Sequence, residues 1–203
     1  MRKLLTILLV IPALVSCGLY RNKVSTPPSE VTFMRVCWDE GNVATYPGED
    51  ADNLKKEDSC EHLGEISWDR SQFPLRVRST IDDPALIIAM MVWNLQLEKD
   101  VFVFGDVGWD IGITTGPAHA PNALAGTVHF SDKGHLGAFV FMYEASLELD
   151  APKRVAIYVH ELGHVLGLGH DFDMPESTMY PYSNPAGELT AADLEAVRKR
   201  YVD

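Results

Sequence analysis

The stretch HELGHVLGLGH, from His160 to His170, decides how the rest of the 203-residue chain is interpreted. Its first two histidines, His160 and His164, are four residues apart, so on a helix they project from one face, one turn apart. Two imidazoles placed in this way can reach one metal ion. Glu161 lies between them in sequence and can reach a water on that metal without binding the metal itself. The spacing therefore predicts a metal site on a helix, with a carboxylate beside it.

A glycine ends the predicted helix and brings in a third histidine. Gly167 lacks a Cβ atom, so it can adopt a left-handed conformation and turn the chain. His170 can then return as the third ligand, which leaves the fourth position for water. That arrangement is typical of a catalytic zinc rather than a structural zinc. No cysteine is close enough in sequence to indicate a closed structural site.

A second motif follows the histidines, because Ser177 to Pro181 reads STMYP. HExxHxxGxxH followed by a methionine turn is the signature of the metzincin metalloproteases. The methionine turn and the later segment LTAADLEAVRKRY, from Leu189 to Tyr201, resemble those of the matrixins, the matrix-metalloprotease family. Asp171, directly after the third histidine, is more similar to the reprolysin branch. The chain is therefore described as matrixin-like, with the subfamily left open.

The resemblance implies a zinc-dependent endopeptidase that hydrolyses peptide bonds of extended protein or peptide substrates. His160, His164 and His170 would bind one catalytic zinc, and Glu161 would act as general base towards a water. Met179 would form an apolar floor below the histidines without binding the metal. Three alternatives stay open: a zinc-containing surface lipoprotein that binds peptide or glycan without turnover, an adhesin or structural lipoprotein that has kept a protease fold, and a hydrolase of a non-protein amide.

Two further expectations rest on the same resemblance. An extended substrate would pair with an exposed edge of the sheet, for which Ala138 to Tyr143 is the candidate. Many matrixins carry a second, structural zinc in the region that here holds His119 and His129, and the preceding stretch offers Asp106 and Asp110 but no histidine. A full ligand set is not visible, so we expect a loop histidine and a strand histidine, and the sequence does not support a second zinc or a calcium.

The N-terminus has the pattern of an export signal. Two basic residues within Met1 to Lys3 precede an apolar run, Leu4 to Val15, that is too short to span a bilayer as a helix. Leu14 to Cys17 resembles a bacterial lipobox. We therefore expect residues 1–16 to be a lipoprotein signal peptide and Cys17 to be lipidated. Ordinary secretion with cleavage nearby is the alternative.

Residues 17–30 contain serine and proline and little that is apolar, which predicts an extended, lipidated tether. Residues 31–203 would then form the matrixin-like catalytic domain. We expect a protein of the bacterial cell envelope that is lipid-anchored at the outer membrane, because Gly18 rather than aspartate follows the cysteine. A periplasmic or secreted protein is the alternative. The membrane would be a partner only through this anchor.

The charge balance argues against one class of partner. The chain has 29 acidic and 17 basic side chains, a formal net charge of −12. This excess argues against nucleic acid, or an anionic membrane surface, as a partner that binds through charge. The length suits a single catalytic domain with a sizeable core, and we expect a monomer.

Cys37 and Cys60 are the two cysteines that remain beside Cys17. In an exported protein, an even number of cysteines left after lipidation favours a disulfide between them. Two buried free thiols are the alternative.

Strand and helix patterns alternate along the chain outside the histidine motif. Short β-branched or aromatic runs predict strands at 31–38, 75–79, 101–104, 111–114, 126–130 and 138–143. A helix capped by Asp82 or Asp83 has an apolar stripe made of Leu86, Met90, Trp93 and Leu97. The zinc-site helix starts at the cap Asp150, and the last helix starts at the cap Thr190. This order predicts an α/β (α+β) domain with a mixed twisted sheet. It also resembles the metzincin-like zincin domain, which implies a long helix, the zinc-site helix, the methionine turn and a C-terminal helix.

Overall fold

The structure is a computed structural model that describes residues 32–38, 66–118, 123–132, 135–171, 173–180 and 189–202. The strands are β1 (Thr32–Trp38), β2 (Leu75–Ser79), β3 (Phe102–Phe104), β4 (Ile111–Thr115), β5 (Ala125–Asp132) and β6 (His135–Met142). The helices are η4 (Arg70–Gln72), α1 (Pro84–Leu97), α2 (Glu144–Leu147), α3 (Ala151–Val165) and α4 (Ala191–Tyr201). For β1 only the backbone is described. None of the helices in these ranges is long and apolar enough to cross a bilayer.

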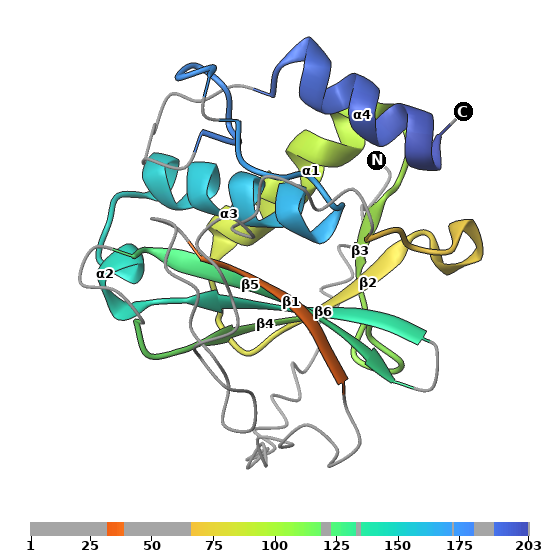
Figure 1. Cartoon of the computed structure of the whole chain (residues 1–203). Coiled ribbons are helices and arrows are strands. Elements are labelled where there is room, and N and C mark those ends of the chain that lie inside the picture. Colours follow the sequence, from red (N-terminus) through yellow and green to blue (C-terminus); the bar gives the residue numbers. More distant parts are fainter. Residues whose placement is uncertain are drawn as a thin grey trace, which may run out of the picture.

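The strands form one mixed sheet of six, in the order β1-β5-β6-β4-β2-β3. Strands β3, β2, β4 and β6 are parallel to one another, and β5 is antiparallel to both β6 and β1. The helices α1, α3 and α4 lie on one side of this sheet (Figure 1). The mixed sheet and the order of helices confirm the predicted α/β fold class.

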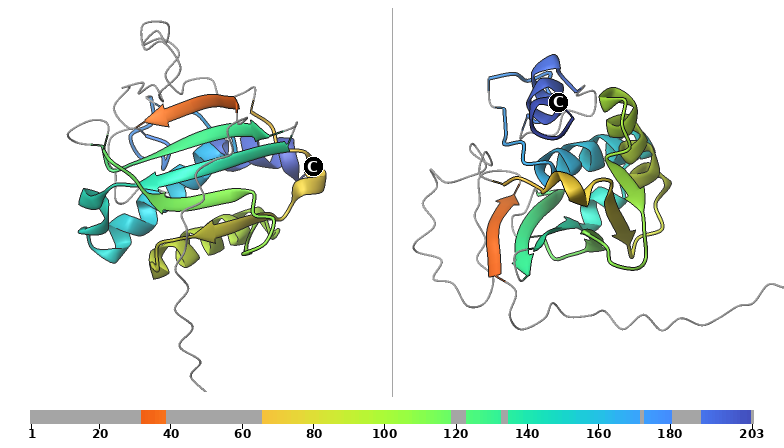
Figure 2. Two further views of the ribbon diagram at one scale, coloured as in Figure 1. Left: turned by 90° about the horizontal axis from the view of Figure 1, so that it is seen from below. Right: turned by 90° about the vertical axis from the view of Figure 1, so that its right-hand side faces the viewer.

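One prediction about the sheet is wrong: Ala138 to Tyr143 does not form an exposed edge. Its strand, β6, pairs with β4 on one side and with β5 on the other. Because β6 comes shortly before α3 in sequence, it was expected at the edge. The preceding strand, β5, forms a hairpin with β6 and covers the side of β6 that would otherwise be open. The outermost strands of the described sheet are β1 and β3. They lie on opposite sides of the domain, with β1 far from α1 (Figure 2).

Helices α1 and α3 are fixed to each other by polar contacts as well as by packing. The Trp93 indole nitrogen donates to the Val159 carbonyl oxygen at 3.0 Å, inside the core. Asp83, the residue that caps α1, also accepts a hydrogen bond from Arg154 of α3 at 2.8 Å. Both residues are largely buried, so this ion pair ties the start of α1 to the first turns of the histidine-bearing helix.

Helix α1 is apolar on both faces. The predicted inner stripe is buried, with exposed fractions of 4% or less for Leu86, Met90, Trp93 and Leu97. The outer face is also apolar, and its side chains are between 48% and 71% exposed: Ile87, Ile88, Met91 and Leu95. The inner face joins the core between α3 and the sheet, whereas the outer face forms a separate apolar surface, which we call the α1 stripe.

Several predictions concern residues outside the described ranges. The signal peptide, Cys17, the tether and Cys60 belong to this part of the chain, and for Cys37 only the backbone is described. The lipidation of Cys17 and the bond between Cys37 and Cys60 therefore stay predictions.

Candidate metal centre

Helix α3 positions the first two histidines. The Asp150 side chain caps the helix by accepting from the Lys153 backbone N–H, and a proline occupies the first turn. Its second half, from Ile157 to Val165, is buried without interruption. His160 and His164 are 8% and 1% exposed, so most of each side chain is covered by the surrounding protein.

Gly167 ends the helix in the way the sequence predicts. Its φ is +84°, in the left-handed region that glycine adopts at little cost. The Gly167 N–H donates to the His164 carbonyl at 2.8 Å, and the Leu168 N–H donates to the Gly163 carbonyl at 3.0 Å. These bonds satisfy carbonyl groups at the helix end and turn the chain back. The turn brings His170, which is 8% exposed, beside the two helical histidines.

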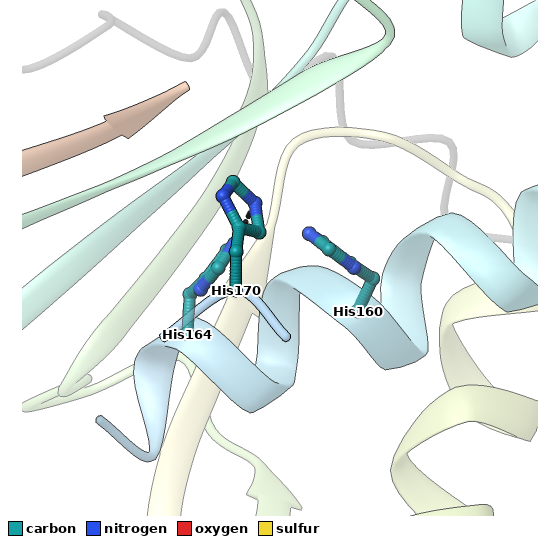
Figure 3. Close-up of side chains that lie close together, drawn as sticks. All are labelled: His160, His164 and His170. Atoms are coloured by element: carbon teal, nitrogen blue, oxygen red, sulfur yellow. Dashed lines mark hydrogen bonds between the residues drawn. The ribbon is translucent and has the colours of Figure 1, made fainter. Parts of the chain in front are cut away.

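The three histidine rings point toward one another (Figure 3). One ring nitrogen from each of His160, His164 and His170 lies within 4.8 Å of the others. The Nε2 atoms of His164 and His170 are 3.1 Å apart. Nitrogens bound to one tetrahedral zinc at its usual bond length lie about 3.3 Å from each other. The spacing of these donors therefore fits a zinc ion.

Backbone carbonyl groups fix the tautomers of two of the rings. Nδ1 of His160 lies 2.6 Å from the Thr178 carbonyl oxygen, and Nδ1 of His164 lies 2.9 Å from the Leu168 carbonyl oxygen. Because a carbonyl oxygen only accepts, Nδ1 carries the hydrogen in both rings. Nε2 then keeps its lone pair, which is the form in which a histidine binds a metal.

The methionine turn packs directly against α3. Met179 is 1% exposed, and a Cβ atom added to Gly163 would lie 2.5 Å from its sulfur. The Met179 N–H donates to the Ser177 hydroxyl, which itself donates to the Asp193 carboxylate at the start of α4. Gly163 was not singled out from the sequence, although its lack of a side chain is what admits the sulfur. The assigned role of Met179 as a floor stays a prediction.

Glu161 is 1% exposed, and its carboxylate meets a side chain that the sequence did not point to. The hydroxyl of Thr127 on β5 donates to Glu161 Oε2 at 2.5 Å. Alternation along a strand shows which side chains share a face, but it does not show which helix residue faces them. The partner of Glu161 therefore becomes visible only in the folded chain.

The other predicted candidates that the structure describes are not part of the histidine cluster. His129 is a strand residue, as expected, and its Nε2 lies 3.2 Å from the Val165 carbonyl; burial lowers its pKa to about 4. Asp110 accepts from the Arg76 backbone N–H and lies 3.2 Å from His135. His119 lies outside the described residues. Within the described ranges, the three buried histidines are the one cluster of three or more potential metal ligands.

A mixed sheet, a helix with two inward histidines, a glycine turn with a third, and a buried methionine turn are together typical of the metzincin class. Residues 69–202 match the family model described as Matrixin, and the chain belongs to this family. It is similar to matrilysin from Rattus norvegicus, with 38% identity over 164 residues, which is 66% of this chain and 58% of that protein. The chain therefore spans about three fifths of the length of this relative.

Proposed function

We propose that this protein is a zinc-dependent endopeptidase that hydrolyses peptide bonds in extended protein substrates. Membership of the matrixin family supports metallopeptidase chemistry. The observation that carries the proposal is the buried group His160, His164 and His170, with ring nitrogens within 4.8 Å of one another, on an element that also carries the buried Glu161 as the next residue after His160.

The three histidines would hold the zinc ion through the ring nitrogens that face one another. Zinc bound there supplies a Lewis acid that polarises the scissile carbonyl and acidifies a water. The Thr178 and Leu168 carbonyl groups keep His160 and His164 in the ligating tautomer, so neither ring needs to change tautomer when the metal enters.

Glu161 is the proposed general base. Its carboxylate takes a proton from the attacking water, and then gives that proton to the amine nitrogen as the C–N bond breaks. Glu161 directly follows His160 in the buried half of α3, so the helix places its backbone next to that of a metal ligand. A binding protein without turnover has no need of a base at this position, so the residue favours hydrolysis over simple capture.

An extended substrate would dock at the edge of the sheet nearest β5, the strand whose Thr127 contacts Glu161. Strand β6 is excluded as the docking edge because both of its sides are paired. Strand β5 pairs with β1 on its outer side, where Cys37 lies opposite Thr127. A peptide that extends the sheet here must therefore pair with β1 or take its place.

The N-terminal sequence supports a further proposal about location. We infer that residues 1–16 are removed, that Cys17 is lipidated, and that residues 17–30 tether the catalytic domain, 31–203, to the bacterial envelope. The basis is the lipobox-like sequence and the composition of the tether. Metabolic labelling with a fatty acid, compared between the wild-type chain and Cys17→Ala, tests this inference, and equal labelling of both would contradict it.

Peptidase activity is tested by incubating the purified protein with a denatured protein mixture, with and without a chelator, and by identifying new termini by mass spectrometry. Glu161→Gln is the matched variant, because it preserves the size of the side chain and removes the base. We expect cleavage that chelation and Glu161→Gln each abolish, while the variant retains zinc. Absence of cleavage by a zinc-loaded wild-type protein would refute the proposal and favour a binding protein or a hydrolase of a non-protein amide.

A further inference from the structure

The hydroxyl of Thr127 contacts the proposed general base inside the protein. Thr127 is 0% exposed, and Glu161 is 1% exposed. Oγ1 of Thr127 lies 2.5 Å from Oε2 of Glu161 and 3.3 Å from the backbone carbonyl oxygen of the same residue. One side chain on the sheet therefore reaches both the carboxylate and the main chain of a single helical residue.

The shorter contact is the chemically dominant one. A hydroxyl has a single hydrogen to donate, and an ionised carboxylate can only accept. Bonds from a hydroxyl to a carboxylate are about 2.5–2.7 Å long and are stronger than bonds between neutral groups. We therefore assign the Thr127 hydrogen to Oε2 of Glu161, with the backbone oxygen as a weaker neighbour.

The sheet holds the Thr127 hydroxyl in place. In the ladder of β5, Thr127 lies opposite Val140 of β6 and opposite Cys37 of β1, so its backbone has a paired strand on each side. Threonine is branched at Cβ, which restricts its first side-chain torsion. A glutamate has three rotatable side-chain bonds, and on a helix these alone would not fix the direction of its carboxylate.

We propose that Thr127 is a positioning residue for Glu161: its hydroxyl holds in one orientation the carboxylate of the residue that follows His160 on α3. This inference rests on the proposed function, since it concerns the base of that reaction. The hydroxyl of Thr127 contacts Glu161, so its effect on the reaction would pass through that carboxylate. Its contribution is to keep the proton acceptor aimed before substrate arrives.

The first test compares two substitutions at this position. Thr127→Val preserves shape and removes the hydroxyl, whereas Thr127→Ser preserves the hydroxyl. We expect Thr127→Val to lower kcat about 10- to 100-fold with little change in KM, because orientation of the base matters in the transition state and not in substrate binding. Thr127→Ser should recover most of the rate.

Thr114→Val is the matched control for removing a hydroxyl from a strand. Thr114 lies on β4, and its hydroxyl receives a hydrogen bond from the hydroxyl of Thr80 at 3.1 Å. The control should leave kcat unchanged. Unchanged kcat in Thr127→Val would overturn the proposal, and so would a serine variant that is as slow as the valine variant.

A second readout does not depend on activity. In the metal-free protein, Thr127→Val should lower the thermal midpoint by about 5 °C, because the buried carboxylate loses its donor. In a Glu161→Met background only the weaker contact with the backbone carbonyl oxygen remains, so the same substitution should lower the midpoint clearly less. Equal shifts in both backgrounds would show that the two side chains are not coupled and would overturn the inference.

The cleavage assay also distinguishes a failure of this inference from a failure of the proposed function. If the wild-type protein cleaves peptides and Thr127→Val cleaves them equally well, only the positioning role fails. If the zinc-loaded wild-type protein cleaves nothing, the proposed function fails, and with it the role assigned to Thr127.

Discussion

Replacing Gly167 by alanine should damage both the stability and the metal site of this protein. At a φ of +84°, a residue with a Cβ atom is strained by about 1–2 kcal/mol. The added carbon would also lie 2.7 Å from the Ile66 carbonyl oxygen and 2.6 Å from a guanidinium nitrogen of Arg200. Arg200 has a long side chain that can move, but Ile66 presents backbone, so the overpacking adds about 1–3 kcal/mol. The total loss of unfolding free energy is about 2–5 kcal/mol.

Thermal unfolding of the metal-free protein measures the stability part. For a domain of this size, the loss corresponds to a fall in the midpoint of about 5–15 °C. Gly167 also directs the turn that carries His170 to the other two histidines. A shifted turn misplaces the third ligand, so zinc affinity, measured by competition with a chelator of known affinity, should fall at least 10-fold.

Gly108→Ala is the control that separates strain from site damage. Gly108 also has a positive φ, +61°, but its added carbon would meet only the end of the flexible Arg76 side chain, at 3.2 Å. Gly108→Ala should therefore lose the unfolding free energy that the positive φ costs an alanine, but it should keep the zinc affinity of the wild-type protein. The reasoning is refuted if Gly167→Ala unfolds within 2 °C of the wild-type protein, or if both alanine variants lose zinc affinity equally.

Three further outcomes follow from the buried contacts. Gly163→Ala should lower the thermal midpoint in spite of the better helix propensity of alanine, because its Cβ would lie 2.5 Å from the Met179 sulfur, and Met179→Ala in the same chain should restore part of the loss. Burial lowers the pKa of His129 to about 4, against about 6.5 in an unfolded chain, so the unfolded state takes up a proton first as pH falls. As the pH falls from 6.5 to 4, His129 should therefore lower the free energy of unfolding by up to about 3 kcal/mol. Denaturant unfolding of wild type and His129→Asn checks this: the difference between their free energies of unfolding should not change with pH above about pH 7. Thr190→Ala should remove about 1 kcal/mol, detectable by the same method, because the Thr190 hydroxyl caps α4 by accepting from the Asp193 N–H; an unchanged midpoint would contradict that cap.

The histidine motif was predictable because its geometry is local. A spacing of four residues on a helix places His160 and His164 together, and Gly167 has the backbone freedom that brings His170 back. The caps Asp83, Asp150 and Thr190 were predictable for the same reason, since each accepts from a backbone N–H two or three residues further along the chain.

Contacts between distant segments were not predictable in this way. No local pattern in the sequence indicates that β5 pairs with the outer side of β6, so the prediction that β6 forms the sheet edge was wrong. The same order of strands places Thr127 against Glu161, a pairing between residues 34 positions apart. Periodicity indicated the buried inner face of α1, but because this helix is also apolar on its other face, the sequence contains no signal for whether that second face would be covered.

The α1 stripe has a consequence for how this protein behaves in concentrated solution. Its four side chains, Ile87, Ile88, Met91 and Leu95, attract the same surface on another molecule, while the formal net charge of −12 keeps molecules apart. Salt weakens only the repulsion, since the screening length falls from about 10 Å at 0.1 M to about 3 Å at 1 M. Colloidal stability should therefore fall as salt is added, and Leu95→Lys should preserve it.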